Sequence, residues 1–417
     1  MVNKKHLFPI VLVISLFFLW AVTSNLLPIL IPHLKKACKL NVMESSLVDS
    51  AYWIAYFVIA LPAGILMKKA GYKTAIITGL LLAAAGAFLF YPAAESRSFG
   101  FFLFALFIVA AGMTFLETSA NPFITILGNP DTSSQRLNFA QAFNGMGAFI
   151  ATMFISKAII GNSIRSDEEL AAFTPEQEFD YYEQLFHSLK LPYIIIGLVL
   201  VLVAILFIIT RFPPKQAMEA NRGSTTKERL SFFKHPNLMG GVIAQFFYVG
   251  AQVCVSSFFI LYAKDVVGIS EYEATTYLGF LLLAFMVGRY VGAFLMNYFP
   301  AEKLLTTYAL INIVLSAYIV VIGGKGALWA FIGVEFFMSI MYPTIFSLAI
   351  RGLGEKTAIA SSYMVMAIVG GAVFPPLLGY ISDSTASLQW AYVVPLICFI
   401  PVWYYGRMQS RRKDIAG

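Results

Sequence analysis

Long runs of apolar residues recur along the whole chain, and short polar segments separate them. Each run has roughly the 20 residues that a helix needs to cross the hydrocarbon core of a bilayer. The pattern predicts twelve membrane-spanning helices, near residues 8–34, 45–67, 74–93, 99–127, 136–161, 191–210, 236–263, 273–298, 302–322, 326–350, 357–382 and 387–406.

The two groups of six helices look like weak repeats of one unit. A shift of 221 positions places Pro122 on Pro343, and a small-residue helix with paired glycines follows each of them. Repeated halves with a site between them are typical of one large class of transporters. The expected domains are an N-terminal half at 1–210, a cytoplasmic linker at 211–235 and a C-terminal half at 236–417.

Composition supports the assignment to the membrane. The chain of 417 residues is 59% hydrophobic and only 12% charged, whereas soluble domains carry about 25% charged residues. With both termini in the cytoplasm, nineteen Lys and Arg fall on the cytoplasmic side and eight outside, and Lys157 and Arg289 lie within helices. This balance favours an N-in, C-in orientation. It also explains the net charge of +7 without a nucleic-acid partner.

The sequence lacks the usual signatures of enzymes. Three cysteines lie far apart, and no P-loop, nucleophile elbow or H-E-x-x-H motif is present. We therefore expect no enzymatic activity, no cofactor, no metal and no ATP-driven pump within this chain. A secondary transporter is favoured over a membrane-embedded enzyme and over a non-transporting sensor.

One span carries a carboxylate at membrane depth. In the segment 110–128, Thr114, Glu117 and Asn121 are spaced to share one helix face, and Pro122 permits a kink. An acid at this depth costs about 2.5–3.5 kcal/mol on insertion scales, so it is usually functional. We interpret the face as part of a polar site inside the bundle. The alternative is a buried Glu that only ties two helices together.

The segment GILMKKAGYK, at 64–73, resembles the loop 2–3 signature of the major facilitator superfamily. Two glycines bracket a tight basic turn there, although Lys68 stands where the signature has an acid. Gly288 and Arg289 look like the related element of the second half. The resemblance implies a gating role for Gly64, Gly71, Lys73 and Arg289, with the first three at a cytoplasmic contact between helices 2 and 11. Ordinary positive-inside anchoring is the alternative.

A closer resemblance, over nearly the whole chain, is to the L-fucose:proton symporter family of that superfamily. It rests on Asn25-Leu26 with Leu30-Ile31-Pro32, ALPAGILMKKAGYK (60–73), LETSANPF (116–123), RLNFAQAFNGMGA (136–148), AQFFYVGAQ (244–252) and MSIMYPTIFSLAI (338–350). It implies an all-α, twelve-helix monosaccharide transporter of the bacterial inner membrane that works by alternating access with proton symport. We expect a monomer whose partners are a sugar, a proton or sodium ion, and the bilayer.

The resemblance also implies site residues. Glu117 matches an acid linked to sugar binding and proton transfer, and Asn25, Asn144 and Tyr342 match polar residues of the sugar cavity. Helix periodicity adds neighbours on the same faces, because amides and phenols suit sugars. The alternative role is helix–helix hydrogen bonding, worth about 0.6 kcal/mol each; Gln245 is as readily explained that way. The predicted substrate-binding residues are Asn25, Glu117, Asn121, Gln141, Asn144, Tyr248, Gln252 and Tyr342.

One position departs from the family pattern. Pro28 stands where the family has an aspartate that carries the proton, and proline cannot titrate. The candidates for ion coupling are therefore Glu117, Glu335, which shares a face with Tyr342, and Asp49, near the outer end of helix 2. A proton on Glu117 is favoured, with sodium symport or an uncoupled facilitator as alternatives. The sequence does not identify the sugar.

Overall fold

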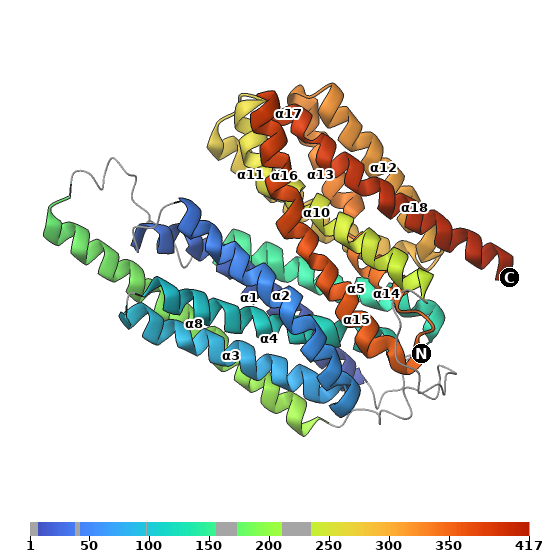
Figure 1. The fold of residues 1–417 in the computed structure, drawn as a ribbon, viewed down its shortest axis with the longest axis horizontal. Coiled ribbons are helices and arrows are strands. Elements are labelled where there is room, and N and C mark those ends of the chain that lie inside the picture. Colours follow the sequence, from blue (N-terminus) through green and yellow to red (C-terminus); the bar gives the residue numbers. More distant parts are fainter. Residues whose placement is uncertain are drawn as a thin grey trace.

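The computed structural model describes residues 7–37, 42–96, 98–127, 129–155, 173–210 and 235–416. In these ranges the helices group into twelve membrane segments, six in each half (Figure 1). The expected linker lies outside the described residues, except for His235. The predicted all-α architecture of two six-helix halves is confirmed.

The N-terminal half, blue to green in Figure 1, provides the first six segments. They are α1 (Leu7–Ala37), α2 (Val42–Ala70), α3 (Tyr72–Ser96), α4 (Phe99–Ile126), α5 (Ser133–Ile150) with the π turn η3 (Ala151–Ile155), and α8 (Pro175–Ile209).

The C-terminal half, yellow to red, provides the other six. They are α10 (Pro236–Asp265), α11 (Glu271–Leu295), α12 (Ala301–Val321), α13 (Gly324–Met338) with α14 (Met341–Ala349), α15 (Thr357–Met366) with η7 (Ala367–Val369) and α16 (Gly370–Thr385), and α17 (Leu388–Ala391) with α18 (Val393–Ala416).

Length and hydropathy support membrane insertion for most of these segments. Among the described residues, ten helices are long and apolar enough to cross a membrane, and a shorter apolar helix covers Val11–Asn25. The helix α5 is outside this set because it carries Arg136, Asn138, Gln141 and Asn144. A segment of low hydropathy inside such a bundle indicates a face turned to a polar interior.

The sixth segment begins earlier than expected. Hydropathy predicts a start near 191, whereas α8 begins at Pro175. The side chains and main chains of Thr174 and Gln177 form a reciprocal capping box, and Pro175 occupies the first helical turn. These signals start a helix independently of hydropathy, so α8 reaches well beyond the apolar run.

The tenth segment is interrupted between α13 and α14, at Ser339 and Ile340. Pro343 follows four residues after Ser339 and has no backbone N–H to donate to its carbonyl. The Ser339 carbonyl oxygen instead accepts a bond from Arg289 Nε at 3.2 Å. The interruption thus supplies an acceptor to a neighbouring helix.

Each half contains the same kind of close contact between two helices at a glycine. A Cβ at Gly147 would lie 2.6 Å from the carbonyl oxygen of Phe18, so α5 and α1 pack backbone to backbone. A Cβ at Gly370 would overlap the carbonyl oxygen of Phe246, which places the eleventh segment against α10 in the same way. Equivalent helices of each half therefore use equivalent small residues for close approach.

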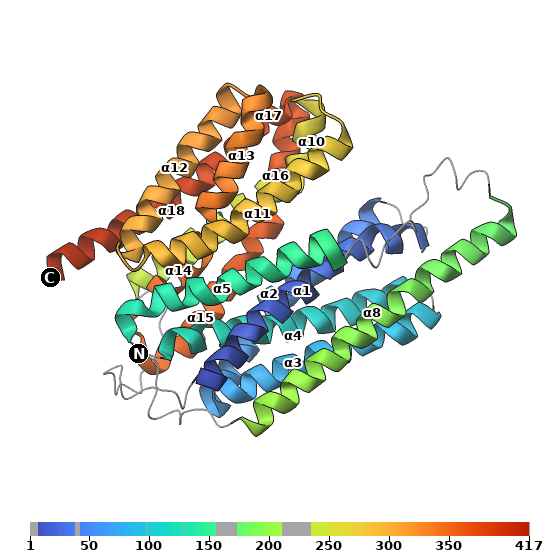
Figure 2. The ribbon, with the colours of Figure 1, turned by 180° about the vertical axis from the view of Figure 1, so that it is seen from behind.

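The halves diverge at one end and meet at the other, toward the chain termini (Figures 1 and 2). At the meeting end, Ser347 Oγ donates to Ser134 Oγ at 2.7 Å, and Asn138 Nδ2 donates to Thr344 Oγ1 at 3.0 Å. In the predicted N-in, C-in orientation, this bonded end is the cytoplasmic one.

Of the three predicted gating residues of loop 2–3, Gly64 lies against the eleventh segment. A Cβ there would overlap Ser362 Oγ and lie 2.9 Å from the carbonyl oxygen of Ala358, both in α15. Gly71 has φ +89° and no described atom within 4 Å of an added Cβ. Lys73 Nζ donates to the carbonyl oxygens of Ile208 and Thr210, at 2.9 and 3.0 Å. The left-handed turn at Gly71 thus leads from α2 into α3, and the expected position of Gly71 and Lys73 at the contact with the eleventh segment stays a prediction.

Candidate functional site

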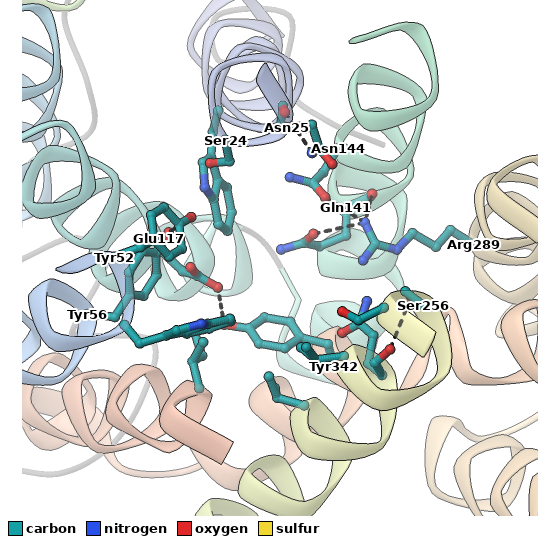
Figure 3. Close-up of a pocket in the computed structure, with 18 of the residues that line it drawn as sticks. Ser24, Asn25, Tyr52, Tyr56, Glu117, Gln141, Asn144, Ser256, Arg289 and Tyr342 are labelled. Carbon is teal, nitrogen blue, oxygen red and sulfur yellow. Dashed lines mark hydrogen bonds between the residues drawn. The ribbon is translucent and has the colours of Figure 1, made fainter. Parts of the chain in front are cut away.

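A cavity of about 440 Å³ lies between the two halves, above their closed end (Figure 3). Its size falls in the range of pockets for small molecules. Residues of both halves line it: Trp20, Ala21, Ser24, Asn25, Tyr52, Trp53, Tyr56, Leu106, Glu117, Gln141, Asn144, Val249, Gln252, Val253, Ser256, Ser257, Arg289, Tyr342 and Ile368.

The structure brings six of the eight predicted substrate-binding residues to this cavity. They are Asn25, Glu117, Gln141, Asn144, Gln252 and Tyr342. The other two, Asn121 and Tyr248, are fully buried and are not among the lining residues. Each lies one helical turn past a lining residue, toward the closed end, because both helices continue beneath the cavity floor.

A hydrogen bond between Glu117 and Tyr342 joins the halves at the cavity. The Tyr342 hydroxyl donates to Glu117 Oε1, and both side chains are buried (Figure 3). Glu117 comes from α4 and Tyr342 from α14, so the carboxylate belongs to one half and its donor to the other. Any event that changes the charge of this carboxylate changes an interaction between the halves.

Arg289 extends from α11 to the opposite side of the cavity, where it contacts α5. Its Nη1 donates to the carbonyl oxygen of Gln141 at 2.6 Å and to Asn144 Oδ1 at 2.9 Å. The guanidinium group is almost completely buried. The sequence predicted a gating role for Arg289, and the structure places its side chain at the central cavity. Its position within an apolar run was the signal for this, since buried charges mark functional sites.

The amides form a connected network beside this arginine. Gln141 Nε2 donates to Asn121 Oδ1 at 3.0 Å, while Asn144 Nδ2 donates to the carbonyl oxygen of Phe17 at 3.3 Å. Asn25 Nδ2 is bonded to the Ala21 carbonyl oxygen of its own helix at 2.8 Å. These bonds fix the orientations of the amides, which present both donors and acceptors to the cavity.

Another buried carboxylate, Glu335, lies beside the cavity in the C-terminal half. Its Oε1 accepts a hydrogen bond from Ser256 Oγ at 3.0 Å, and Ser256 lines the cavity. Both residues belong to the same half, in α13 and α10. The side chains of Asp49 and Pro28 lie outside the described residues.

Sequence reasoning missed the aromatic wall of the cavity. Trp20 comes from α1, while Tyr52, Trp53 and Tyr56 come from α2. The Tyr52 hydroxyl donates to that of Tyr56 at 3.2 Å, and the rings of Tyr52 and Trp53 meet edge to face at 5.6 Å. Aromatic residues in a span are equally typical of lipid contact, so the spacings of three and four that place Tyr52, Trp53 and Tyr56 on one face of α2 were the available signal.

The lining combines three kinds of chemistry in one small space. Aromatic faces offer apolar contact, amides and hydroxyls offer paired donors and acceptors, Glu117 adds an ionisable carboxyl group, and Arg289 adds a guanidinium group. Such a set suits a small polyhydroxylated molecule that has an apolar C–H face. The two halves share the contacts, so a bound molecule would touch both.

Comparison with known proteins gives a family and several relatives. The profile of the family described as the Major Facilitator Superfamily matches residues 12–368. The L-fucose-proton symporter of Escherichia coli (strain K12) is 41% identical over 416 residues, which cover 98% of this chain and 94% of that protein. A glucose/galactose transporter of Brucella abortus is 37% identical over 411 residues, covering 98% and 96%.

Solved structures agree with these matches. The crystal structure of FucP, a major facilitator transporter in the outward conformation, has a TM-score of 0.89 and 40% sequence identity. The match covers 97% of this chain and 99% of that chain. The proton:xylose symporter XylE has a TM-score of 0.68 at 13% identity, covers 97% and 95%, and shows a shared fold alone.

Proposed function

Because this chain belongs to the major facilitator superfamily and, within it, to the group of the L-fucose-proton symporter, we propose that it imports a monosaccharide together with a proton. The carrier works by alternating access, as a monomer in the inner membrane of a bacterium. The substrate class is a hexose or deoxyhexose, which suits the volume and the mixed aromatic and amide lining of the cavity.

The observation that carries the proposal is the Tyr342 to Glu117 hydrogen bond inside this cavity. An ionised carboxylate only accepts hydrogen bonds, whereas a protonated one also donates. A proton on Glu117 therefore changes both its bond across the halves and the hydrogen bonds that it offers to a sugar hydroxyl. One group thus links proton binding, sugar binding and the contact between the halves.

Glu335 lacks that link to the opposite half. Its bond to Ser256 stays within the C-terminal half, so its charge has no such direct effect on the interface. Pro28 supplies no titratable group in α1, and the segment Leu7–Ala37 contains no Asp or Glu. We therefore propose Glu117 as the proton carrier and Glu335 as a residue that orients Ser256.

Proteoliposomes with imposed gradients test the proposal. L-fucose, D-glucose and D-galactose, each radiolabelled, are offered to the purified protein with a pH gradient, a sodium gradient or no gradient. The wild type is expected to accumulate at least one of these sugars when the lumen is less acidic than the bath. Glu117→Gln is expected to abolish accumulation and retain sugar exchange.

The matched control is Glu335→Gln, which keeps an acceptor oxygen for Ser256 and is expected to accumulate sugar. Loss of accumulation in this variant alone would assign the proton to Glu335. Accumulation with a sodium gradient and none with a pH gradient would establish sodium symport. Equilibration of sugar without accumulation under either gradient would identify an uncoupled facilitator.

A further inference from the structure

Polar residues of α10 continue past the cavity toward its closed end. Gln252 lines the cavity, and Gln245 precedes it by seven residues, close to two helical turns. Gln245 therefore points in nearly the same direction as Gln252 but lies about 10 Å deeper along the helix axis. In α4, Asn121 stands one turn deeper than Glu117 in the same way.

These two deeper amides have unmet hydrogen-bonding capacity. Gln245 is fully buried, and neither its Nε2 nor its Oε1 has a hydrogen-bond partner. Asn121 is also fully buried, and its Nδ2 is unpaired while its Oδ1 accepts from Gln141. A buried polar atom without a partner carries the full penalty of its desolvation. The buried Gln245 side chain therefore destabilises this state of the protein.

Two polar pairs nearer the closed end join the halves. The bonds from Asn138 to Thr344 and from Ser347 to Ser134 close the cytoplasmic end. Tyr342 lies between the cavity and the deeper residues, with its ring 6.4 Å from that of Tyr248. Tyr342 also donates to Glu117 of the other half, so this bond belongs to the contact that must separate when the cytoplasmic end opens.

We propose that Gln245 and Asn121 form an inner sugar subsite that is complete only when the cavity opens to the cytoplasm. The inference rests on the proposed function and extends it to the second state of the carrier. Sugar hydroxyl groups supply the donors and acceptors that the two amides lack in this state. The sugar thereby keeps polar partners as it leaves Gln252 and Glu117, and binding there favours the inward-facing state.

Sided exchange measurements test this subsite. The full chain is studied in right-side-out and everted membrane vesicles, with no ion gradient, and with the labelled sugar among L-fucose, D-glucose and D-galactose that exchanges fastest. The test variant is Gln245→Met, which keeps side-chain length and removes both polar atoms. It is expected to raise the half-saturating sugar concentration at the cytoplasmic face by about three- to tenfold. This factor corresponds to the usual free-energy contribution of one hydrogen bond. The change at the outer face should stay below about twofold, since the residue is buried in that state.

The matched control is Asn312→Leu. Asn312 is another fully buried amide with an unpaired Oδ1, but it lies in α12 and donates to the carbonyl oxygen of Val334. Its replacement is expected to affect both faces equally. Equal effects of Gln245→Met on the two faces, or no effect on either, would overturn the inner subsite while leaving the proposed function intact. If the wild type exchanges none of the three sugars, both the inner subsite and the proposed function are overturned.

Thiol labelling provides an independent measurement if Gln245→Met does not fold. Gln245→Cys is prepared in a chain whose Cys38, Cys254 and Cys398 are replaced by alanine. A small water-soluble methanethiosulfonate added to everted vesicles is expected to label this variant, and saturating sugar is expected to slow the labelling severalfold. Absence of labelling, or labelling that sugar leaves unchanged, would also overturn the subsite.

Discussion

Replacement of Gly64 by alanine should shift the carrier toward the state that is open to the cytoplasm. The added methyl group would overlap Ser362 Oγ and lie 2.9 Å from the carbonyl oxygen of Ala358, which is 0.5 Å short of ordinary contact at 3.4 Å. The hydroxyl group can rotate away, but the carbonyl oxygen belongs to the backbone of α15. The helices α2 and α15 must therefore move apart.

The size of the shift follows from this overlap. Overpacking of a tight contact costs about 1–3 kcal/mol. The cost applies to the state in which α2 and α15 touch at this end and is relieved when the cytoplasmic end opens. The equilibrium between the two states is therefore expected to change by about 5- to 150-fold. Sugar affinity within each state should change little, since Gly64 does not line the cavity.

Labelling of a reporter thiol measures the shift. Ser347→Cys places the thiol at the closed end, where Ser347 is 1% exposed and bonded to Ser134. In everted vesicles, Gly64→Ala is expected to speed its labelling by an impermeant reagent in proportion to the open population. Gly100→Ala is the matched control, because no described atom lies within 4 Å of its added Cβ.

A second substitution tests whether the overlap with α15 causes the shift in the conformational equilibrium. Ser362→Gly removes the side-chain part of the overlap and leaves the Ala358 carbonyl oxygen, so it should restore part of the closed population in Gly64→Ala. If the labelling rate of the double variant departs from the sum of the two single effects, the effect arises at this contact. Unchanged labelling in Gly64→Ala would refute the argument that this contact holds the cytoplasmic end closed.

Two further substitutions test other parts of the structure. Arg289→Lys keeps the charge but loses the planar fork that reaches Gln141 and Asn144, so sugar exchange in proteoliposomes should fall at least about tenfold; near-normal exchange would show that the charge alone suffices. Gly71→Val forces a branched side chain into φ +89°, at a cost of about 1–2 kcal/mol. It should lower the melting temperature in detergent while folded protein keeps its exchange rate, and slower exchange without lost stability would instead support a gating turn.

The sequence predicted the helices because the membrane imposes a simple rule on them. Apolar runs of sufficient length become spans, so the limits of α4 and α12 fell within a residue or two of those expected. The start of α8 was missed because a polar capping box, rather than hydropathy, sets it. The interruption at Ser339 was missed because Pro343 lies four residues beyond it, within the next helical piece.

The candidate site was predictable where a polar residue type and its helix phase both indicated a position at the cavity. Glu117 and Gln252 are polar residues within apolar spans, and each lines the cavity. Phase alone cannot give depth along a helix, so Tyr248 was placed at the cavity although it lies beneath it. The position of Arg289 depends on how α11 packs against α5 of the other half, and no local pattern encodes that contact.

The cavity draws its lining from many helices, with only a few side chains from each. Most of these helices keep a separate apolar face for packing, so the framework and the recognition surface are largely different sets of residues. A single exchange at a lining position can therefore alter preference for a ligand while the scaffold persists. Natural variation can explore new specificities in small steps within this architecture, and a designer who wishes to retarget the carrier can begin with the same few positions.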